Sequence, residues 1–194
     1  MKKLFILPLL VLAGHASAQM STTPKVVLLM LEQVRAELKI RPDQAKKLDD
    51  ALDAMIQTLP SGVRGISMDP HEIPLIEKEV AKVLDPSQQT RLRQIWMQMQ
   101  GGLTLSDEGL SKELALSDEQ KTNLKNLVAD MEIELEEMAA NSAGGPMNPM
   151  FVRKQTGDKI LALLTPDQKK KWESMLGPKF EIKGPAKSSP LLLQ

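Results

Sequence analysis

The sequence lacks most of the residues from which common catalytic and metal sites are built. It has no cysteine and no tyrosine, and it has only two histidines. Without cysteine, the chain can form neither a disulfide framework nor a lipid anchor on a cysteine. The chain has too few residues for a zinc site of Cys and His or for a catalytic arrangement that pairs Ser or Cys with His. His71 is the only histidine after residue 15. We interpret His71, next to Pro70, as a solvated loop residue; a general base is the alternative.

Net charge and glycine-rich phosphate loops are also missing. Lys plus Arg and Asp plus Glu both number 25, so no overall charge attracts the chain to nucleic acid or to a membrane surface. The glycine pairs at 101–102 and 144–145 follow expected helices rather than strands, unlike phosphate-binding loops. We therefore expect a protein that is not an enzyme, has no cofactor or metal, and does not bind nucleic acid.

The residues that are present suit a helical core. Hydrophobic residues make up 42% of the 194 residues, aromatic ones only 3%, and there are 12 methionines. A core of aliphatic side chains and methionine is expected, because methionine fills irregular gaps. The methionines also suggest an adaptable binding surface or a soft-metal site, but core filling explains most of them.

The first 18 residues have the pattern of a secretory signal peptide. Lys2 and Lys3 precede an apolar stretch over residues 4–13, and Ala16-Ser17-Ala18 is a small-residue cleavage site. The apolar stretch is too short for a convincing membrane span. We expect cleavage before Gln19 and export to the periplasm or the medium, with no membrane span in the mature chain.

A repeated five-residue motif marks helix starts. In Leu164-Thr165-Pro166-Asp167-Gln168, Thr165 provides an N-cap oxygen, Pro166 suits the first helical position, and Gln168 lies three residues after the cap. Weaker copies occupy residues 40–44, 84–88 and 116–120. Their cap positions hold Arg41, Asp85 and Ser117, and their glutamines are Gln44, Gln88 and Gln120. Arginine cannot accept the capping hydrogen bond, so the helix at residue 42 should have the loosest start.

Apolar periodicity predicts an all-α fold of about seven or eight helices in antiparallel hairpins or a bundle. The expected ranges are 24–39, capped by Thr23-Pro24, 42–58, 72–83, 86–100, 106–114, capped by Ser106, 117–140, a segment through 151–163, and 165–177. Residues 60–72 and 141–149 are expected loops. Equivalent glutamines lie 76 and 80 residues apart, which predicts two related helical halves over 19–102 and 103–178 and a flexible tail over 179–194. Chance recurrence of good helix caps is the alternative.

A few apolar residues lie away from the main helical stripes. Leu29 points nearly opposite the stripe of the first helix, so this segment is either buried on all sides or meets a partner or a second copy of the chain. Met97 lies off the stripe of its helix and is expected to be exposed. Together with Trp96 and Met99 on the same helix, these residues form the candidate partner-binding set. The acidic run over residues 130–137 is interpreted as a solvated helix face; a contact for basic clients or cations is the alternative.

The motif series in an exported helical chain resembles the Spy/CpxP family of periplasmic proteins, which is marked by a repeated Leu-Thr-x-x-Gln pattern. The copy at 164–168 matches fully, those at 84–88 and 116–120 have a substituted cap, and the copy at 40–44 is degenerate. The resemblance implies an ATP-independent chaperone that holds unfolded clients, or a stress-related accessory to an envelope signalling system. A structural or adaptor module that binds one dedicated envelope partner, or itself as a homodimer, is the competing interpretation.

Overall fold

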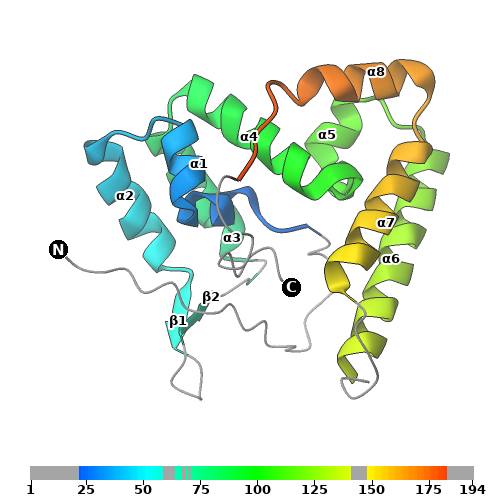
Figure 1. Ribbon diagram of the computed structural model, residues 1–194, viewed down its shortest axis with the longest axis horizontal. Coiled ribbons are helices and arrows are strands. Elements are labelled where there is room, and N and C mark those ends of the chain that lie inside the picture. Colours follow the sequence, from blue (N-terminus) through cyan, green and yellow to red (C-terminus); the bar gives the residue numbers. More distant parts are fainter. Residues whose placement is uncertain (1–21, 59–63, 67–68, 70, 141–147, 183–194) are drawn as a thin grey trace. The chain divides into compact units, whose positions relative to one another are not determined.

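The described part of the chain is mainly helical, as the sequence predicted (Figure 1). The computed structural model describes residues 22–58, 64–66, 69, 71–140 and 148–182. These residues form two compact units, one containing 24–89 and 182, the other containing 22–23 and 90–181. The boundary falls inside helix α4 (Pro86–Gln100), whose bounds match the prediction. The expected signal peptide and the tail from residue 183 lie outside the described residues.

The first unit is built around two packed helices and a short 3-10 segment. Its elements are the 3-10 helix η1 (Lys25–Met30), α1 (Glu32–Glu37), α2 (Pro42–Asp53), strands β1 (Ile56–Thr58) and β2 (Arg64–Ile66), and α3 (Ile73–Val83). Helices α2 and α3 pack on each other and both contact η1. The buried faces hold Leu48 and Leu52 from α2 and Ile76 and Val80 from α3. These residues recur at helical spacing, which is why the sequence located both helices.

The expected single helix over residues 24–39 is wrong, because the chain bends at Leu31. That residue is extended, with φ −87° and ψ 120°, between η1 and α1. Thr23 provides no side-chain cap, and Pro24 occupies the N-cap position. All four residues over 26–29 are buried. A 3-10 segment with apolar side chains on every face needs burial on every side. Of the two interpretations of Leu29, burial on all sides therefore holds in this structure.

The second expected helix is also too long. Helix α2 ends at Asp53, and Ile56–Thr58 forms a strand that pairs antiparallel with Arg64–Ile66, with Ile56 opposite Ile66. Residues 56–58 are Ile-Gln-Thr, and the β-branched Ile and Thr favour an extended chain. Part of the expected loop over 60–72 is therefore a strand, and residues 59–63, 67–68 and 70 lie outside the described residues.

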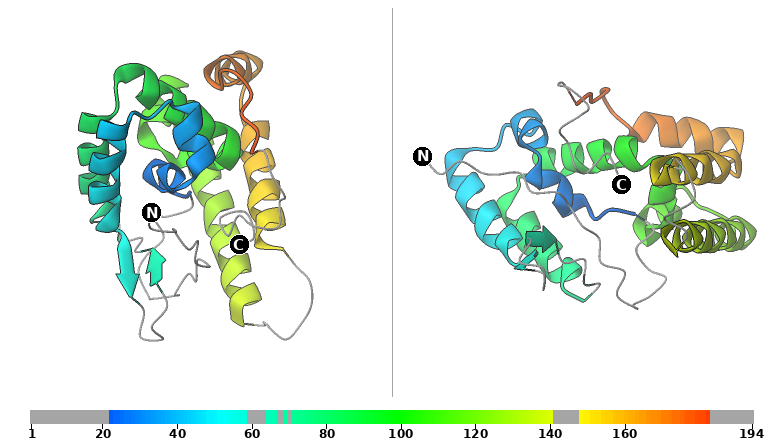
Figure 2. Two further views of the ribbon diagram at one scale, coloured as in Figure 1. Left: turned by 60° about the vertical axis from the view of Figure 1, so that its left-hand side comes forward. Right: turned by 60° about the horizontal axis from the view of Figure 1, so that its bottom comes forward.

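The second unit contains the longest helix of the described chain. Its elements are most of α4, the 3-10 helix η2 (Gly101–Ser106), α5 (Glu108–Glu113), α6 (Asp118–Ala140), α7 (Pro149–Ala162) and α8 (Pro166–Met175). Helices α6 and α7 lie side by side in every view (Figures 1 and 2). The N-cap of α5 is Asp107, which accepts from the N–H of Leu110 at 2.9 Å, and not Ser106 as predicted. In α7 the N-cap is Asn148, and residues 141–147 of the expected loop lie outside the described residues.

Two glycines allow η2 to pack directly against α7. A Cβ atom added to Gly102 would lie 2.1 Å from the carbonyl oxygen of Gly157, in the middle of α7. Both residues are buried. Glycine is required at position 102 because any larger residue would separate the two backbones.

The last described residues are attached to α4 within the second unit. Gly177 ends α8 with φ +64°, and Gln98 donates to the carbonyl oxygens of Leu176 and Pro178 at 2.6 and 2.9 Å. The backbone N–H of Phe180 donates to Gln98 Oε1 at 2.7 Å. The start of the predicted tail is therefore hydrogen-bonded to this unit.

Candidate functional site

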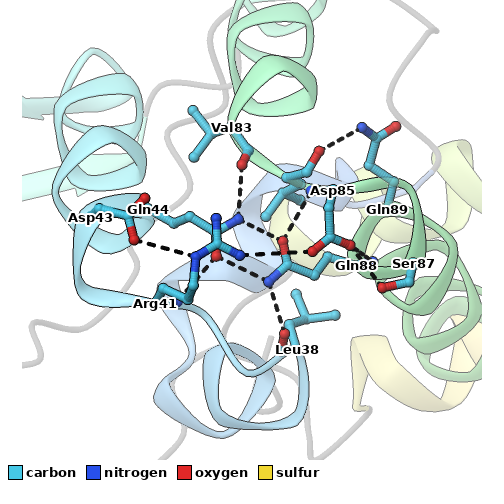
Figure 3. A network of polar contacts seen from close by, with 10 residues as sticks. Leu38, Arg41, Asp43, Gln44, Val83, Asp85, Ser87, Gln88 and Gln89 are labelled. Carbon is cyan, nitrogen blue, oxygen red and sulfur yellow. Dashed lines mark hydrogen bonds and ion pairs between the residues drawn. The ribbon is translucent and has the colours of Figure 1, made fainter.

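The glutamines of the first two motif copies form a closed pair. Gln44 Nε2 donates to Gln88 Oε1 at 2.7 Å, and Gln88 Nε2 donates back to Gln44 Oε1 at 3.1 Å (Figure 3). Each oxygen also accepts from the N–H at its own helix start, Arg41 for Gln44 at 3.1 Å and Asp85 for Gln88 at 3.0 Å. Both side chains are buried. The pair therefore joins the N-termini of α2 and α4.

The same two amides also bind the ends of the preceding helices, in exchanged order. Gln44 Nε2 donates to the carbonyl of Val83, the last residue of α3, at 2.9 Å. Gln88 Nε2 donates to the carbonyl of Leu38, the C-cap of α1, at 3.1 Å. A side-chain amide has two acceptor sites and two donors, and all four are used in each glutamine. Four helix termini, which would otherwise leave backbone groups unpaired, meet at one buried cluster.

The second unit repeats this arrangement. Gln120 and Gln168 donate to each other's Oε1 at 2.7 and 3.1 Å. Gln120 also donates to the carbonyl of Leu163 at 2.8 Å, and Gln168 to that of Ala115 at 3.2 Å. Their oxygens accept from the N–H groups of the cap residues Ser117 and Thr165, both at 2.9 Å. Both glutamines are only half-buried, so this second cluster is more open to water than the first.

The cap residues behave as their chemistry predicts. Thr165 Oγ1 accepts from the N–H of Gln168 at 3.3 Å, and Ser117 Oγ accepts from that of Gln120 at 3.1 Å. Asp85 Oδ1 accepts from the N–H of Gln88 at 2.9 Å, and this hydrogen bond, followed by that from Ser87, lowers the pKa of Asp85. Arg41 provides no side-chain cap, as expected, and pairs instead with Asp43 and Asp85 at 3.4 and 3.9 Å. At that helix start the buried Gln44 provides the anchorage that the cap does not.

These clusters hold helices together and present no reactive group. Their polar atoms are amides and backbone groups, all paired with one another, and no described buried side-chain atom lacks a hydrogen-bond partner. Within the described ranges, no group of three or more His, Asp or Glu is placed to hold a metal ion. His71 is exposed, as the sequence indicated, and its backbone N–H donates to Asp69 at 2.8 Å.

Most of the predicted partner-binding residues lie inside the protein. Leu29, Trp96 and Met97 are 0%, 4% and 1% exposed, so the expected exposure of Met97 is wrong. Trp96 Nε1 donates to the carbonyl of Thr23 at 2.7 Å, which uses its polar atom internally. Met99 is half-buried. The periodicity failed at Met97 because α4 is covered on more than one side, and a helix covered in this way has no single apolar stripe.

Among the described residues, the exposed large apolar side chains lie outside the predicted partner-binding set. Leu75 on α3, Ile133 on α6 and Phe151 on α7 are 65%, 56% and 62% exposed. Ile133 gave a usable signal, since it lies opposite the stripe formed by Met131, Leu135 and Met138. The pairing of the glutamines was also missed, because a capping box explains each one without a partner.

Comparisons with models of protein families, with curated proteins and with solved structures give no match for this chain. The resemblance to the Spy/CpxP family therefore remains a prediction from the motif. Among the residues that the structure describes, no helix is long and apolar enough to cross a membrane.

Proposed function

We propose that this chain is an exported, non-enzymatic binding protein of the periplasm that holds unfolded client chains on its helical surface without ATP. One observation carries the proposal. Three large apolar side chains, Leu75, Ile133 and Phe151, are more than half exposed on otherwise polar helix faces. Exposed apolar side chains beside charges suit weak contacts with exposed segments of unfolded chains while the complex stays soluble. The motif resemblance and the signal-peptide pattern supply the cellular setting.

The motif copies support this proposal through stability rather than through contact with clients. Their glutamines are satisfied by one another and by helix ends, so they fix the frame on which the helix faces are displayed. We also propose that the two units descend from one repeated unit. Lys39 and Ala115, both with positive φ at the ends of α1 and α5, are 76 residues apart, the same separation as Gln44 and Gln120.

The test is suppression of client aggregation by the mature protein, beginning at Gln19. A chemically denatured model client is diluted into buffer with increasing amounts of the protein and no nucleotide, and light scattering is followed. We expect suppression near a one-to-one ratio. No suppression at any ratio or salt concentration would refute the proposal.

A dedicated envelope partner is the second candidate, and the charge of α6 favours it. The segment 126–140 carries five carboxylates and no lysine or arginine. A surface of one sign selects among partners more strongly than a mixed one. Suppression that is limited to one client, among several of different charge and fold, would support the adaptor over the chaperone.

A further inference from the structure

One face of α6 has an apolar side chain surrounded by carboxylates. Ile133 is 56% exposed, and the residues three before, three after and four after it are Asp130, Glu136 and Glu137. Residues at these spacings are neighbours on a helix surface. All three carboxylates are exposed. The face is therefore an apolar centre with a negative rim.

The exposed carboxylates on this part of α6 are not neutralised by ion pairs with other described residues. Asp130, Glu134, Glu136 and Glu137 form no ion pair with any residue within the described ranges. Exposed carboxylates elsewhere commonly do form one: Glu79 pairs with Lys82, Glu108 with Lys112, and Asp158 with Lys154. Repulsion along α6 is also felt at Glu132, whose pKa is raised by burial and by the charge of Glu136.

A second exposed apolar side chain lies at the same end of the α6–α7 hairpin. Helices α6 and α7 run side by side in opposite directions (Figures 1 and 2). Glu132 and Arg153 interact electrostatically, so they mark one level of the hairpin. Ile133 follows Glu132 directly, and Phe151, 62% exposed, is two residues before Arg153. Among the described residues of the second unit, the two exposed large apolar side chains thus lie near the same level of the hairpin, beside the acidic run of α6.

We propose that this end of the α6–α7 hairpin, defined by Asp130, Ile133, Glu136, Glu137 and Phe151, docks polypeptide segments in which apolar residues are flanked by lysine or arginine. This inference rests on the proposed function and names the class of client. Basic side chains relieve the repulsion among the unpaired carboxylates, and an apolar side chain between them covers Ile133. A single bound cation fits less well, because no group of three carboxylates within the described ranges converges on one point.

The experiment measures peptide binding to the mature protein by fluorescence anisotropy. The probe is a labelled helical peptide of leucine and lysine, and its match has glutamate in place of every lysine. We expect the lysine peptide to bind, the glutamate peptide to bind at least tenfold more weakly, and added salt to weaken the binding, since exposed charges are screened over about 10 Å at 0.1 M. Two variants, Ile133→Ser and Glu136→Gln/Glu137→Gln, should each weaken binding about three- to tenfold.

A matched control comes from the first unit. Asp50→Asn/Asp53→Asn removes two exposed carboxylates near the end of α2. This variant should bind the lysine peptide as the wild type does. Circular dichroism confirms that each variant is folded, which is expected because every substituted side chain is exposed.

Equal binding of the two peptides, or equal losses in the hairpin and control variants, would overturn the inference. The aggregation assay run on the same variants separates the two proposals. If the wild type suppresses aggregation and the hairpin variants keep peptide binding, the proposed function stands and the docking surface is wrong. If the wild type binds the peptide at the hairpin and suppresses no aggregation, the chaperone function fails instead.

Discussion

The side-chain amides of Gln44 and Gln88 bind each other in both directions, 44 residues apart in the chain. Each also accepts from the N–H at its own helix start and donates to the end of the helix before the other motif. The motif glutamine is thus a helix cap and a connection between helices at once. Loss of one partner leaves the other buried and unsatisfied, which gives the first prediction.

Gln88→Ala should lower the free energy of unfolding by about 1–3 kcal/mol, the cost of leaving buried polar groups without partners. Gln168→Ala should cost less, because Gln168 and Gln120 are only half-buried and water can replace the lost bonds. Urea denaturation of both variants measures the difference. A larger loss for Gln168→Ala than for Gln88→Ala would contradict this ranking.

Thr165→Ala should destabilise the protein by about 1 kcal/mol, as expected when an N-cap side chain is removed. Thr165 Oγ1 accepts from the N–H of Gln168, and alanine leaves that group to water. Thr165→Ser keeps the hydroxyl and should restore most of the stability. Client binding should persist in Thr165→Ala, and its loss in a variant that is still folded would place the motif in the binding site.

Gly102→Ala should lower the free energy of unfolding by about 1–3 kcal/mol or more, because the added methyl group forces the backbones of η2 and α7 apart. The melting temperature should fall clearly as a result. The new Cβ would meet the carbonyl oxygen of Gly157 at 2.1 Å. Gly109→Ala is the control, because its Cβ meets only Asp107 Oδ1, at 3.1 Å. Similar melting temperatures for the two variants would show that η2 does not pack on α7 in this way.

The pKa of Glu132 predicts a pH-dependent effect. Burial and the charge of Glu136 raise this pKa in the folded state, while Arg153 lowers it. The folded chain therefore binds a proton at Glu132 more tightly than the unfolded chain does. The stability gained from this tighter binding is fully present below the unfolded pKa and is lost as the pH rises through the folded pKa. Glu132→Gln, which stays uncharged, should be slightly more stable than the wild type at pH 7 and equal to it at about pH 3.

Thermal unfolding at both pH values checks this, with the exposed Glu134→Gln as the control. A Glu132→Gln variant less stable than the wild type at pH 7 would mean that the attraction to Arg153 outweighs burial and repulsion.

The elements that the sequence located correctly are those whose ends carry local chemistry. Helix α4 runs from Pro86 to Gln100 as predicted, between a proline at its first position and Gly101, which has φ +57°. The bend at Leu31 and the strand at Ile56 were missed because local apolar spacing continues through both. Burial of Met97 and pairing of Gln44 with Gln88 depend on segments far away in the chain, which periodicity within one helix cannot reveal.

The central claim is that this protein holds client chains on exposed helix faces while its motifs keep the frame folded. Light scattering of a denatured client, with no nucleotide, tests it most directly when the wild type is compared with Ile133→Ser/Phe151→Ser at equal concentration. We expect suppression near a one-to-one ratio by the wild type and clearly weaker suppression by the variant, with both proteins folded. No suppression by the wild type at any ratio or salt concentration would rule out this function.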